Sequence, residues 1–513
     1  MTRRRALGIL LVVAWLGLMG WHARDSYLQP EMTRLAQATL SLEPGTYFYA
    51  VRMGGQVVGM ASSRLDTIPD GFLLEDRLSL EIQAMAAEGA ATAGTTVHLS
   101  QTLQMTRFSF ELSSDAGRFQ ASGEMQGDSL LQVVVEAGGG PEELSFRVGD
   151  RPLSAAALPL RIARGGELRV GRVLRFPVFD PSTVSTRQVE VEVMERDTII
   201  LPDSAIRDPG SGRWAGDGGR PVTAWRLKER YGGIEVESWI DEDGRMIRSS
   251  SPMGLSLERM PFELVDQERS DRLLADRGGS SPDLVFSTAI AADAELTDLE
   301  AGDELRFLLS GVELDGFELD GGRQELRGDT LVVRRERMDE LTPGFSLPYP
   351  RMDLADHLRP EPLIQSGDPR VERVARDAVR ALGPGRADPT RAALRLNDVV
   401  HQMLDKEITF SLPSALQVLE TRRGDCNEHT VLYVALARAL GLPARTAVGL
   451  VHLEGSFFYH AWPEVWLGEW VAVDPTLGQG PAGVTHLRFM TGNLAQQVEI
   501  ARLIGNLRIR SLS

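Results

Sequence analysis

Apolar and polar residues alternate along much of residues 40–265, and this period of two predicts strands that bury one face. From Ile234 to Ile240, isoleucine, valine and serine alternate with glutamate and tryptophan, and Asp243-Gly244 then offers a hairpin turn. We therefore predict a β-rich domain over residues 40–265, built as an open barrel or a sandwich.

A second strand-rich unit follows a linker. The stretch from Asp266 to Asp283 is charged, then rich in glycine and serine, which is typical of a connection between domains. Beyond it, turn pairs at Asp315-Gly316 and Gly321-Gly322 separate short apolar segments. We interpret residues 283–345 as a small β domain.

The pattern becomes helical after Pro369, where apolar residues recur at spacings of three and four. The predicted helices cover residues 371–382, 389–406, 412–421 and 430–440. Gly441 and Pro443 end the last helix, as expected at a C-terminus. Strand-like segments come next, so we predict a final domain of mixed α+β structure over residues 355–500.

The N-terminus carries a membrane-targeting pattern, because three arginines precede an uninterrupted apolar run from Ala6 to Trp21. The run is slightly short for a spanning helix of about 17 to 25 residues, and slightly long for a signal-peptide core of about 7 to 15. We expect residues 1–24 to be a signal anchor, with a cleaved signal peptide as the alternative. The bulk of the chain is then extracytoplasmic, in a bacterial periplasm, or secreted after cleavage.

The composition excludes one class of partner. The 513 residues carry a net charge of -17, which argues against non-specific nucleic-acid binding.

Cys426 is the one cysteine, so no intramolecular disulfide can form. It begins a predicted helix, with Asp425 as a plausible N-cap. The free N–H groups there favour a thiolate, and they are possible donors to an oxyanion.

Two further residues are candidates to act with this cysteine. His460 precedes a turn at Gly468-Glu469, and Asp474 lies at the end of the returning strand. A hairpin would bring them opposite each other, so that the carboxylate holds one imidazole nitrogen while the other faces Cys426. The tryptophans of this hairpin are expected to wall the site.

Four sequence blocks carry a resemblance to a known family. They are Gly-Asp-Cys-Asn-Glu-His at 424–429, Ala-Arg-Ala-Leu-Gly-Leu-Pro-Ala-Arg at 437–445, His-Ala-Trp-Pro-Glu-Val-Trp at 460–466 and Asp-Pro-Thr at 474–476. In this order they resemble the transglutaminase-like superfamily, especially its bacterial cysteine peptidases and amidases, over the C-terminal quarter of the chain. The resemblance implies a papain-like core, with Cys426 as nucleophile, His460 as general base and acid, and Asp474 orienting His460.

The complete expectation is an α+β protein with a papain-like transglutaminase core, preceded by β-rich extracytoplasmic domains and a membrane anchor. Its activity would be acyl transfer on amide or peptide bonds. Animal transglutaminases carry glutamine where this chain has Asp425, so hydrolysis is favoured over transamidation. The alternative is a non-catalytic envelope scaffold or binding protein.

Other residues near the blocks have weaker assignments. Asp425, Glu428, His429 and Trp462 are candidates to contact substrate or to support the triad. Gln417 is the only nearby side chain that resembles the papain-type oxyanion donor, and Arg445 is expected to form a structural ion pair.

The expected ligands are few. A metal site built from His429, His452 and His460 was weighed, but these residues lack a tight ligand motif, so no metal is expected. Calcium is possible by analogy with animal members, but the chain has no evident acidic loop for it, and no cofactor is expected. The expected partners are a peptide or protein substrate and a membrane contacted through residues 1–24, with no nucleic acid.

Overall fold

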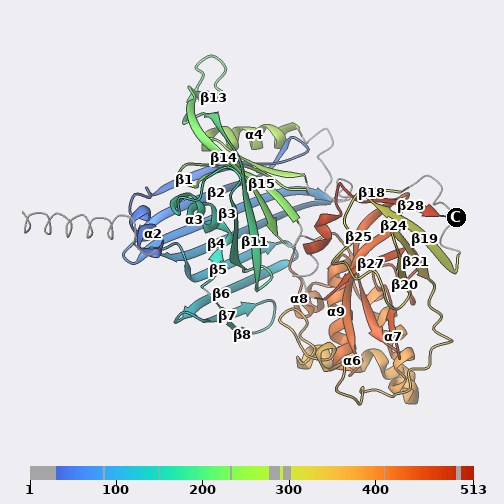
Figure 1. Ribbon diagram of the computed structural model, residues 1–513. Helices are drawn as coiled ribbons and strands as arrows, with labels where there is room; N and C mark the ends of the chain where they lie inside the picture. Colours follow the sequence, from blue (N-terminus) through green and yellow to red (C-terminus); the bar gives the residue numbers. More distant parts are fainter. Residues whose placement is uncertain are drawn as a thin grey trace, which may run out of the picture.

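The computed structural model describes residues 31–512, except 85–86, 150, 232–233, 253, 276–288, 293–301, 410 and 493–497. About 47% of the chain is strand and 21% is helix, so the predicted mixture of the two is confirmed. The predicted anchor, residues 1–24, lies outside the described residues. Among the helices that are described, none is both long and apolar enough to cross a membrane. Figure 1 shows two bodies side by side, one rich in strands and one mixed.

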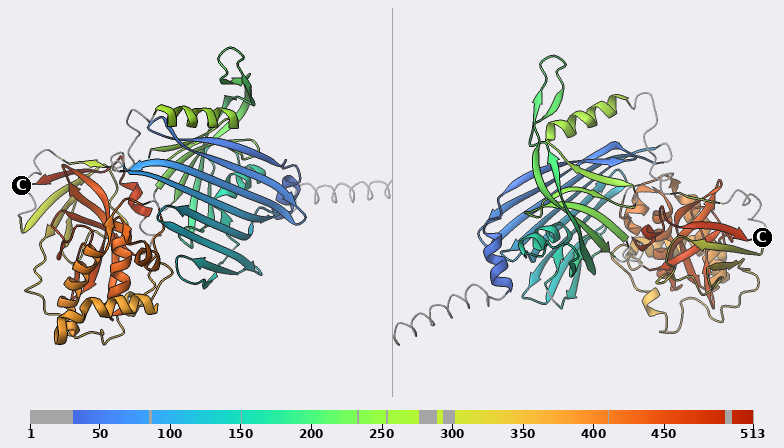
Figure 2. Two further views of the ribbon diagram at one scale, coloured as in Figure 1. Left: turned by 180° about the vertical axis from the view of Figure 1, so that it is seen from behind. Right: turned by 45° about the horizontal axis from the view of Figure 1, so that its top comes forward.

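The N-terminal body is one curved, open sheet of fifteen described strands (Figure 2). Its strands pair antiparallel, apart from the parallel pair of β9 and β10. In sheet order they are β8 (Glu142–Arg147), β7 (Leu130–Glu136), β6 (Gly117–Gln126), β5 (Met105–Ser114), β4 (Ala87–Ser100), β3 (Gly71–Ala84), β2 (Gln56–Ile68), β1 (Gly45–Met53), β17 (Leu255–Arg259), β16 (Met246–Ser250), β15 (Ile234–Asp241), β14 (Arg220–Tyr231), β11 (Ser185–Leu201), β10 (Val173–Asp180) and β9 (Leu153–Ser154).

Smaller elements complete this body. A hairpin projects from the end of β11 and β14, where Ile200 is 71% exposed. The additional elements are α2 (Glu31–Thr39), η1 (Ala155–Ala157), α3 (Leu158–Arg164), β12 (Ser204–Arg207), β13 (Trp214–Asp217) and α4 (Phe262–Ala275).

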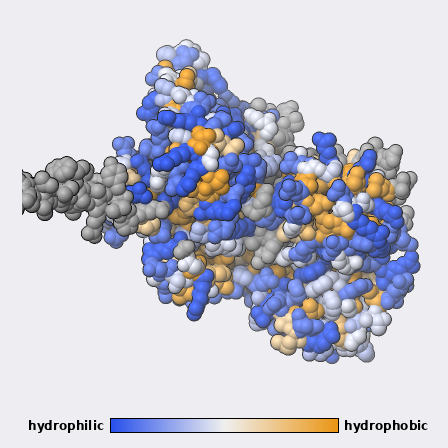
Figure 3. Space-filling model, viewed as in Figure 1, coloured by the Kyte–Doolittle hydropathy of each residue, from blue (hydrophilic) through white to orange (hydrophobic). Residues whose placement is uncertain are grey.

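The face of the molecule seen in Figure 3 is mostly hydrophilic, with apolar residues in small groups.

Helices of the C-terminal body begin at strong N-caps. The side chains of Asp368, Asp388, Ser414 and Asp425 each accept a backbone N–H of the first helical turn. Helix α9 is central, since most of its residues are buried against the other helices and the sheet. The elements are η3 (Ala355–His357), α6 (Pro369–Val379), η4 (Arg380–Ala387), α7 (Pro389–Met403), α8 (Ala415–Thr421) and α9 (Cys426–Ala439).

Two sheets pack together behind α9 through one apolar cluster. In the larger, the order is β18 (Ile290–Ala291), β25 (Ser456–Trp466), β24 (Ala444–Leu453) and β27 (His486–Thr491), with β26 (Trp470–Ala472) paired to β25. In the smaller, the order is β20 (Gln324–Arg327), β21 (Thr330–Arg334), β19 (Glu304–Ser310) and β28 (Arg508–Leu512). Strand β28 therefore returns to the unit that precedes the helices. The remaining elements are β22 (Asp405–Lys406), β23 (Arg423–Gly424) and η5 (Val498–Arg502).

The two bodies meet beside the start of α9. The side chain of Gln417 on α8 donates to the carbonyl of Arg118 at 2.5 Å, and Arg423 donates to the carbonyl of Asp115 at 2.6 Å. A Cβ on Gly138 would lie 2.3 Å from Gln417 Cγ, so glycine permits this close approach. Turns of the large sheet thus support the segment that leads to Cys426. The side-chain amide of Gln417 is engaged in that contact between the two bodies.

Candidate active site

The first turn of α9 presents Cys426. Asp425 caps the helix, because its Oδ1 accepts the N–H of Asn427 at 2.8 Å, while Glu428 Oε2 accepts the N–H of Asp425 at 2.9 Å. This reciprocal capping box fixes where the helix begins. The thiol is half-buried, and the backbone N–H of Ala461 on β25, the residue after His460, acts to lower its pKa.

Glu428 lies beneath this turn and is only 3% exposed. Its Oε1 accepts the hydroxyls of Thr409 at 2.5 Å and Ser411 at 2.7 Å. A Cβ on Gly424 would lie 2.3 Å from Glu428 Cγ, which explains why glycine precedes the capping residue. Both carboxylate oxygens are therefore engaged within the protein, where they hold the segment around Cys426.

The hairpin of β25 and β26 brings His460 and Asp474 together. Its register pairs Glu464 with Ala472 and Trp466 with Trp470. Nε2 of His460 lies 2.7 Å from Oδ2 of Asp474, and both residues are buried. Because the carboxylate occupies Nε2, Nδ1 is the ring nitrogen of His460 that is left for another partner.

A second histidine, His486, shares the same carboxylate oxygen. Its Nε2 lies 2.8 Å from Asp474 Oδ2, and the N–H of Leu477 donates to Oδ1 at 2.9 Å. The rings of His460 and His486 are 5.6 Å apart between centroids. His486 lies outside the four sequence blocks and was therefore not predicted to join the site. Its place at the start of the strand after the Asp474 loop was the only available signal.

Burial dominates the electrostatics of the nucleophile. It raises the pKa of the Cys426 thiol well above its usual range, and the charge of Asp425 adds to this, while the N–H of Ala461 opposes it. Burial also raises the pKa of Asp425, with a further contribution from the charge of Glu428. These effects oppose the thiolate stabilisation expected from the helix N-terminus.

The pKa values of Asp474 and His486 are both lowered, in contrast to that of Cys426. Burial alone would raise the pKa of Asp474, but its interactions with His460 and His486 hold it well below its usual range. Burial lowers the pKa of His486, and its bond to Asp474 opposes that effect. An ionised Asp474 therefore accepts hydrogen bonds from both imidazoles.

His429 and Trp462 lie in the same region without joining the triad. The Nδ1 atom of His429 is 2.7 Å from the carbonyl of Asp425, and the ring is fully buried. Trp462 is 1% exposed, and its ring lies 5.2 Å from that of His486. Among the described residues, neither His429 Nε2 nor Trp462 Nε1 has a hydrogen-bond partner. Both side chains fill the interior beside the triad.

The described residues contain one group with the spacing of a metal site. Its members are His460, Asp474 and His486, whose candidate ligand atoms lie within 4.8 Å of one another. It is a different set from the His429, His452 and His460 combination weighed above. Two hydrogen bonds already link the three side chains through these atoms. Their proximity is thus explained without an ion, and we assign no metal.

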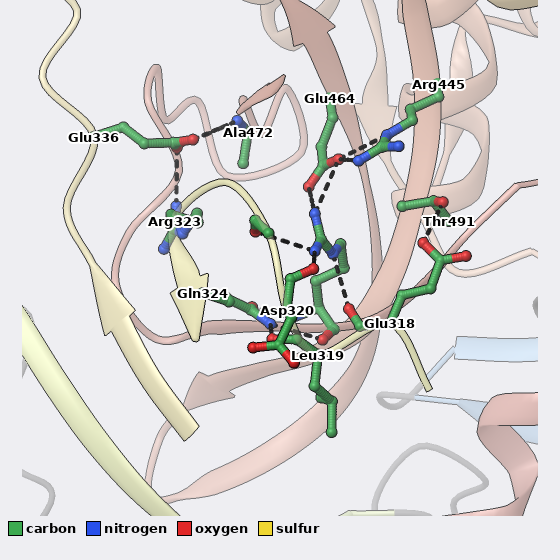
Figure 4. Close-up of polar contacts among 12 residues, drawn as sticks. Glu318, Leu319, Asp320, Arg323, Gln324, Glu336, Arg445, Glu464, Ala472 and Thr491 are labelled. Atoms are coloured by element: carbon green, nitrogen blue, oxygen red, sulfur yellow. Dashed lines mark hydrogen bonds and ion pairs between the residues drawn. The ribbon is translucent and has the colours of Figure 1, made fainter. Parts of the chain in front are cut away.

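A buried charged network lies behind the hairpin (Figure 4). Glu464 accepts two hydrogen bonds from Arg445, at 2.8 and 2.6 Å, and two from Arg488, at 3.1 and 3.4 Å. The ion pair expected for Arg445 is thus present. Arg488 also donates to the carbonyls of Glu318 at 3.2 Å and Asp320 at 2.9 Å. The network ties β25 and β27 to the segment before β20.

A second part of this network reaches the Asp474 loop. Glu336 accepts the N–H of Ala472 at 3.2 Å and pairs with Arg323 at 3.3 Å. Arg323 also donates to the carbonyl of Ala482 at 2.7 Å. Burial raises the pKa of Glu336 to about 7, although Arg323 opposes the shift. The unit around β20 and β21 therefore braces both ends of the loop that carries Asp474.

Residues 376–475 match the model of a family described as the transglutaminase-like superfamily. The matched segment contains Cys426, His460 and Asp474 and lies in the C-terminal part of the chain. The resemblance inferred from the four sequence blocks is therefore confirmed. No curated protein is similar to the chain at a significant level.

Solved structures show only distant similarity. A candidate cysteine protease from Cytophaga hutchinsonii shares 18% identity over 42% of this chain and 84% of its own, with a TM-score of 0.27. A beta-barrel-like protein with a domain of unknown function, from Brucella abortus, shares 11% identity over 43% of this chain and 95% of its own, with a TM-score of 0.32. At these TM-scores neither similarity supports an argument.

Proposed function

We propose that the transglutaminase-like segment of this chain is a thiol-dependent enzyme that hydrolyses amide or peptide bonds. The observation that carries the proposal is the packing of α9, which begins at Cys426, against β25, which carries His460, whose imidazole is bonded to Asp474 at 2.7 Å. A nucleophile, a base and a group that orients the base are the components of covalent acyl transfer.

The proposed reaction has two stages. His460 Nδ1 removes the thiol proton as Sγ attacks the amide carbon, and then returns that proton to the leaving nitrogen as the C–N bond breaks. The product is a thioester and a free amine. Water then attacks the thioester carbon, with His460 again accepting a proton, and the thiol is regenerated. Asp474 stabilises the imidazolium formed in each stage.

Two features indicate which molecule attacks the thioester and which groups bind the oxyanion. Asp425 occupies the position where animal transglutaminases carry glutamine, which favours water over an amine as acceptor. Backbone N–H groups at the start of α9 are the donors nearest to the thiol, so they are the candidates to bind the oxyanion. We also propose a papain-like arrangement, supported by the packing of α9 against β24 and β25.

The activity can be tested with a panel of fluorogenic peptide amides, using the full chain solubilised in detergent. We expect turnover that is lost in Cys426→Ala and His460→Ala. His98→Ala, on β4 of the N-terminal body, is the matched control and should retain activity. Turnover that survives in Cys426→Ala would exclude the proposed nucleophile.

A non-catalytic envelope scaffold is the second candidate function. The observation that favours it is the raised pKa of Cys426, because a resting thiol is a weaker nucleophile than a thiolate. Alkylation by iodoacetamide discriminates between the two functions. A catalytic Cys426 should be alkylated more slowly when His460 is replaced by alanine. A structural cysteine should be alkylated at the same rate in both proteins.

We further propose that residues 1–24 anchor the protein so that the remaining chain is extracytoplasmic. The arginines before the apolar run support this orientation. Protease added to intact spheroplasts should digest the bulk of the chain. Protection in intact spheroplasts, followed by digestion after lysis, would contradict the orientation.

A further inference from the structure

The Asp474 carboxylate is fully committed to three donors. Its Oδ2 accepts Nε2–H of both His460 and His486, at 2.7 and 2.8 Å, and Oδ1 accepts the N–H of Leu477 at 2.9 Å. Asp474 is 0% exposed and His486 only 1%. A buried carboxylate needs such donors, because each unmet acceptor costs about 1 to 3 kcal/mol.

We infer that His486 is a positioning residue, which holds Asp474 through the same oxygen that orients His460. This inference rests on the proposed function for its effect on catalysis, but its geometry stands independently. With an ionised Asp474, each imidazole donates through Nε2 and keeps a lone pair on Nδ1. For His460 that lone pair serves Cys426. The Nδ1 of His486 has no partner among the described residues, so His486 acts through Nε2.

The second donor restricts how the carboxylate can move. With His460 alone on Oδ2, only the N–H of Leu477 on Oδ1 would oppose rotation about the Cβ–Cγ bond, and the imidazole could tilt with the carboxylate. His486 approaches from β27, on the other side of β24 from His460, so the two donors hold Oδ2 from different strands. A base displaced by about 1 Å can lose about 100-fold in rate, so this restriction has catalytic consequences.

The strand that carries His486 is itself fixed. His486 pairs with Val451 of β24, and a Cβ on Gly449 would lie 1.9 Å from the carbonyl of Leu487. Glycine at 449 therefore lets β27 lie close to β24. Two residues beyond His486, Arg488 is held by Gln324 and Glu464. These contacts hold the backbone of β27 in place, and that backbone positions the His486 imidazole against Asp474.

The charged and titratable surroundings of this pair come from several elements. Asp474 interacts with His460 on β25, with His486 on β27 and, more weakly, with His429 on α9. The Arg323 guanidinium, from the segment before β20, also acts on His486. Loss of the His486 donor leaves the carboxylate with fewer compensating groups, so Asp474 becomes easier to protonate.

The test compares His486→Leu, which removes the donor, with His486→Gln, whose amide nitrogen can donate from a similar position. In the full chain with ¹⁵N-labelled histidine, we expect low-field imidazole N–H signals from His460 and His486, beside that of His429, whose Nδ1 donates to the carbonyl of Asp425. His486→Leu should lose the His486 signal and shift that of His460, and Asp474→Asn should shift both. This readout requires no substrate, so it separates failure of the inference from failure of the proposed function.

On the fluorogenic substrates, we expect His486→Leu to lower kcat by about 10- to 100-fold with little change in KM. The acid limb of its pH profile should move to higher pH, and His486→Gln should restore most of the activity. A wild-type kcat and pH profile in His486→Leu would overturn the inference, as would equal loss in both variants when both retain the wild-type circular dichroism spectrum.

Discussion

Gln324 and Arg488 pair as residues of neighbouring strands do, although the glutamine uses its side-chain amide. Its Nε2 donates to the carbonyl of Arg488 at 2.9 Å, and its Oε1 accepts the N–H of Arg488 at 2.6 Å. Gln324 is 3% exposed, so no solvent can replace these bonds easily. The amide therefore joins the unit around β20 to the strand that begins with His486.

Gln324→Ala should destabilise the protein markedly. It leaves a buried N–H and a buried carbonyl of Arg488 unpaired, at about 1 to 3 kcal/mol each. We expect a loss of about 2 to 5 kcal/mol in the free energy of unfolding, measured with urea and tryptophan fluorescence. Gln120→Ala is the control, because that amide only contacts Glu111 at 3.4 Å. Equal stability of the two variants would show that the Gln324 bonds contribute little.

Asp425→Asn should make Cys426 easier to ionise. Asparagine keeps the N-cap acceptor but removes the negative charge that, after burial, raises the pKa of the thiol. A nearby charge typically shifts a pKa by about 1 unit or more. We expect the pH midpoint of iodoacetamide labelling to fall by about 1 unit, and the wild-type midpoint to lie above the usual thiol value of about 8.5.

The control for this experiment is Asp197→Asn, on β11 of the N-terminal body, which should leave the labelling curve unchanged. A midpoint that does not move in Asp425→Asn would mean that the Asp425 carboxyl is already neutral at the pH where the thiol ionises. A wild-type midpoint below 8.5 would show that the helix N-terminus outweighs burial.

Because of Glu336, the free energy of unfolding should fall as the pH rises from weakly acidic to neutral. Its folded pKa of about 7 lies above its ordinary value of 4.5. The stabilisation is thus fully present below about pH 4.5 and is lost as the pH rises through 7. Relative to Glu336→Gln, the wild type should lose up to a few kcal/mol over this window in urea titrations at several pH values.

The exposed Glu340→Gln is the matched control, since its carboxylate is 67% exposed. The prediction would be contradicted if the wild type became more stable, relative to Glu336→Gln, as the pH rises over the same window. In that case Arg323 would have to lower the pKa of Glu336 by more than burial raises it.

Glu464→Ala should be among the most damaging single substitutions in this body. The carboxylate is 3% exposed and compensates two arginines, Arg445 and Arg488, which would otherwise be left close together and poorly solvated. Removing one member of a buried ion pair costs about 3 to 5 kcal/mol. Thermal unfolding should show a large drop in Tm. Glu372→Ala, which breaks the exposed pair with Arg376, should shift Tm only slightly.

The sequence predicted features that depend on neighbouring residues. The helix that begins at Cys426, its Asp425 cap and the hairpin between His460 and Asp474 follow from capping rules and local periodicity. An ion pair for Arg445 was also predicted, although its partner Glu464 was not identified. Within each of these features, the residues that interact lie fewer than about twenty positions apart in the sequence.

Features that depend on distant segments were not predicted. His486 reaches Asp474 only because β27 pairs with β24, and nothing local to the histidine indicates that pairing. Likewise, the role of Gln417 is set by a turn of the large sheet, far away in sequence. Periodicity identifies strands but not their partners, so the order of the fifteen described strands was also beyond prediction.

The pairing of β28 with β19 has a consequence for biosynthesis. Leu308 lies opposite Arg510, so the four-stranded sheet that braces the Asp474 loop cannot be completed until the chain has been synthesised to that point. Helices α6 to α9 emerge earlier and can pack beforehand, since their contacts are local. A nascent chain would therefore carry a formed helix α9 before β28 completes the four-stranded sheet.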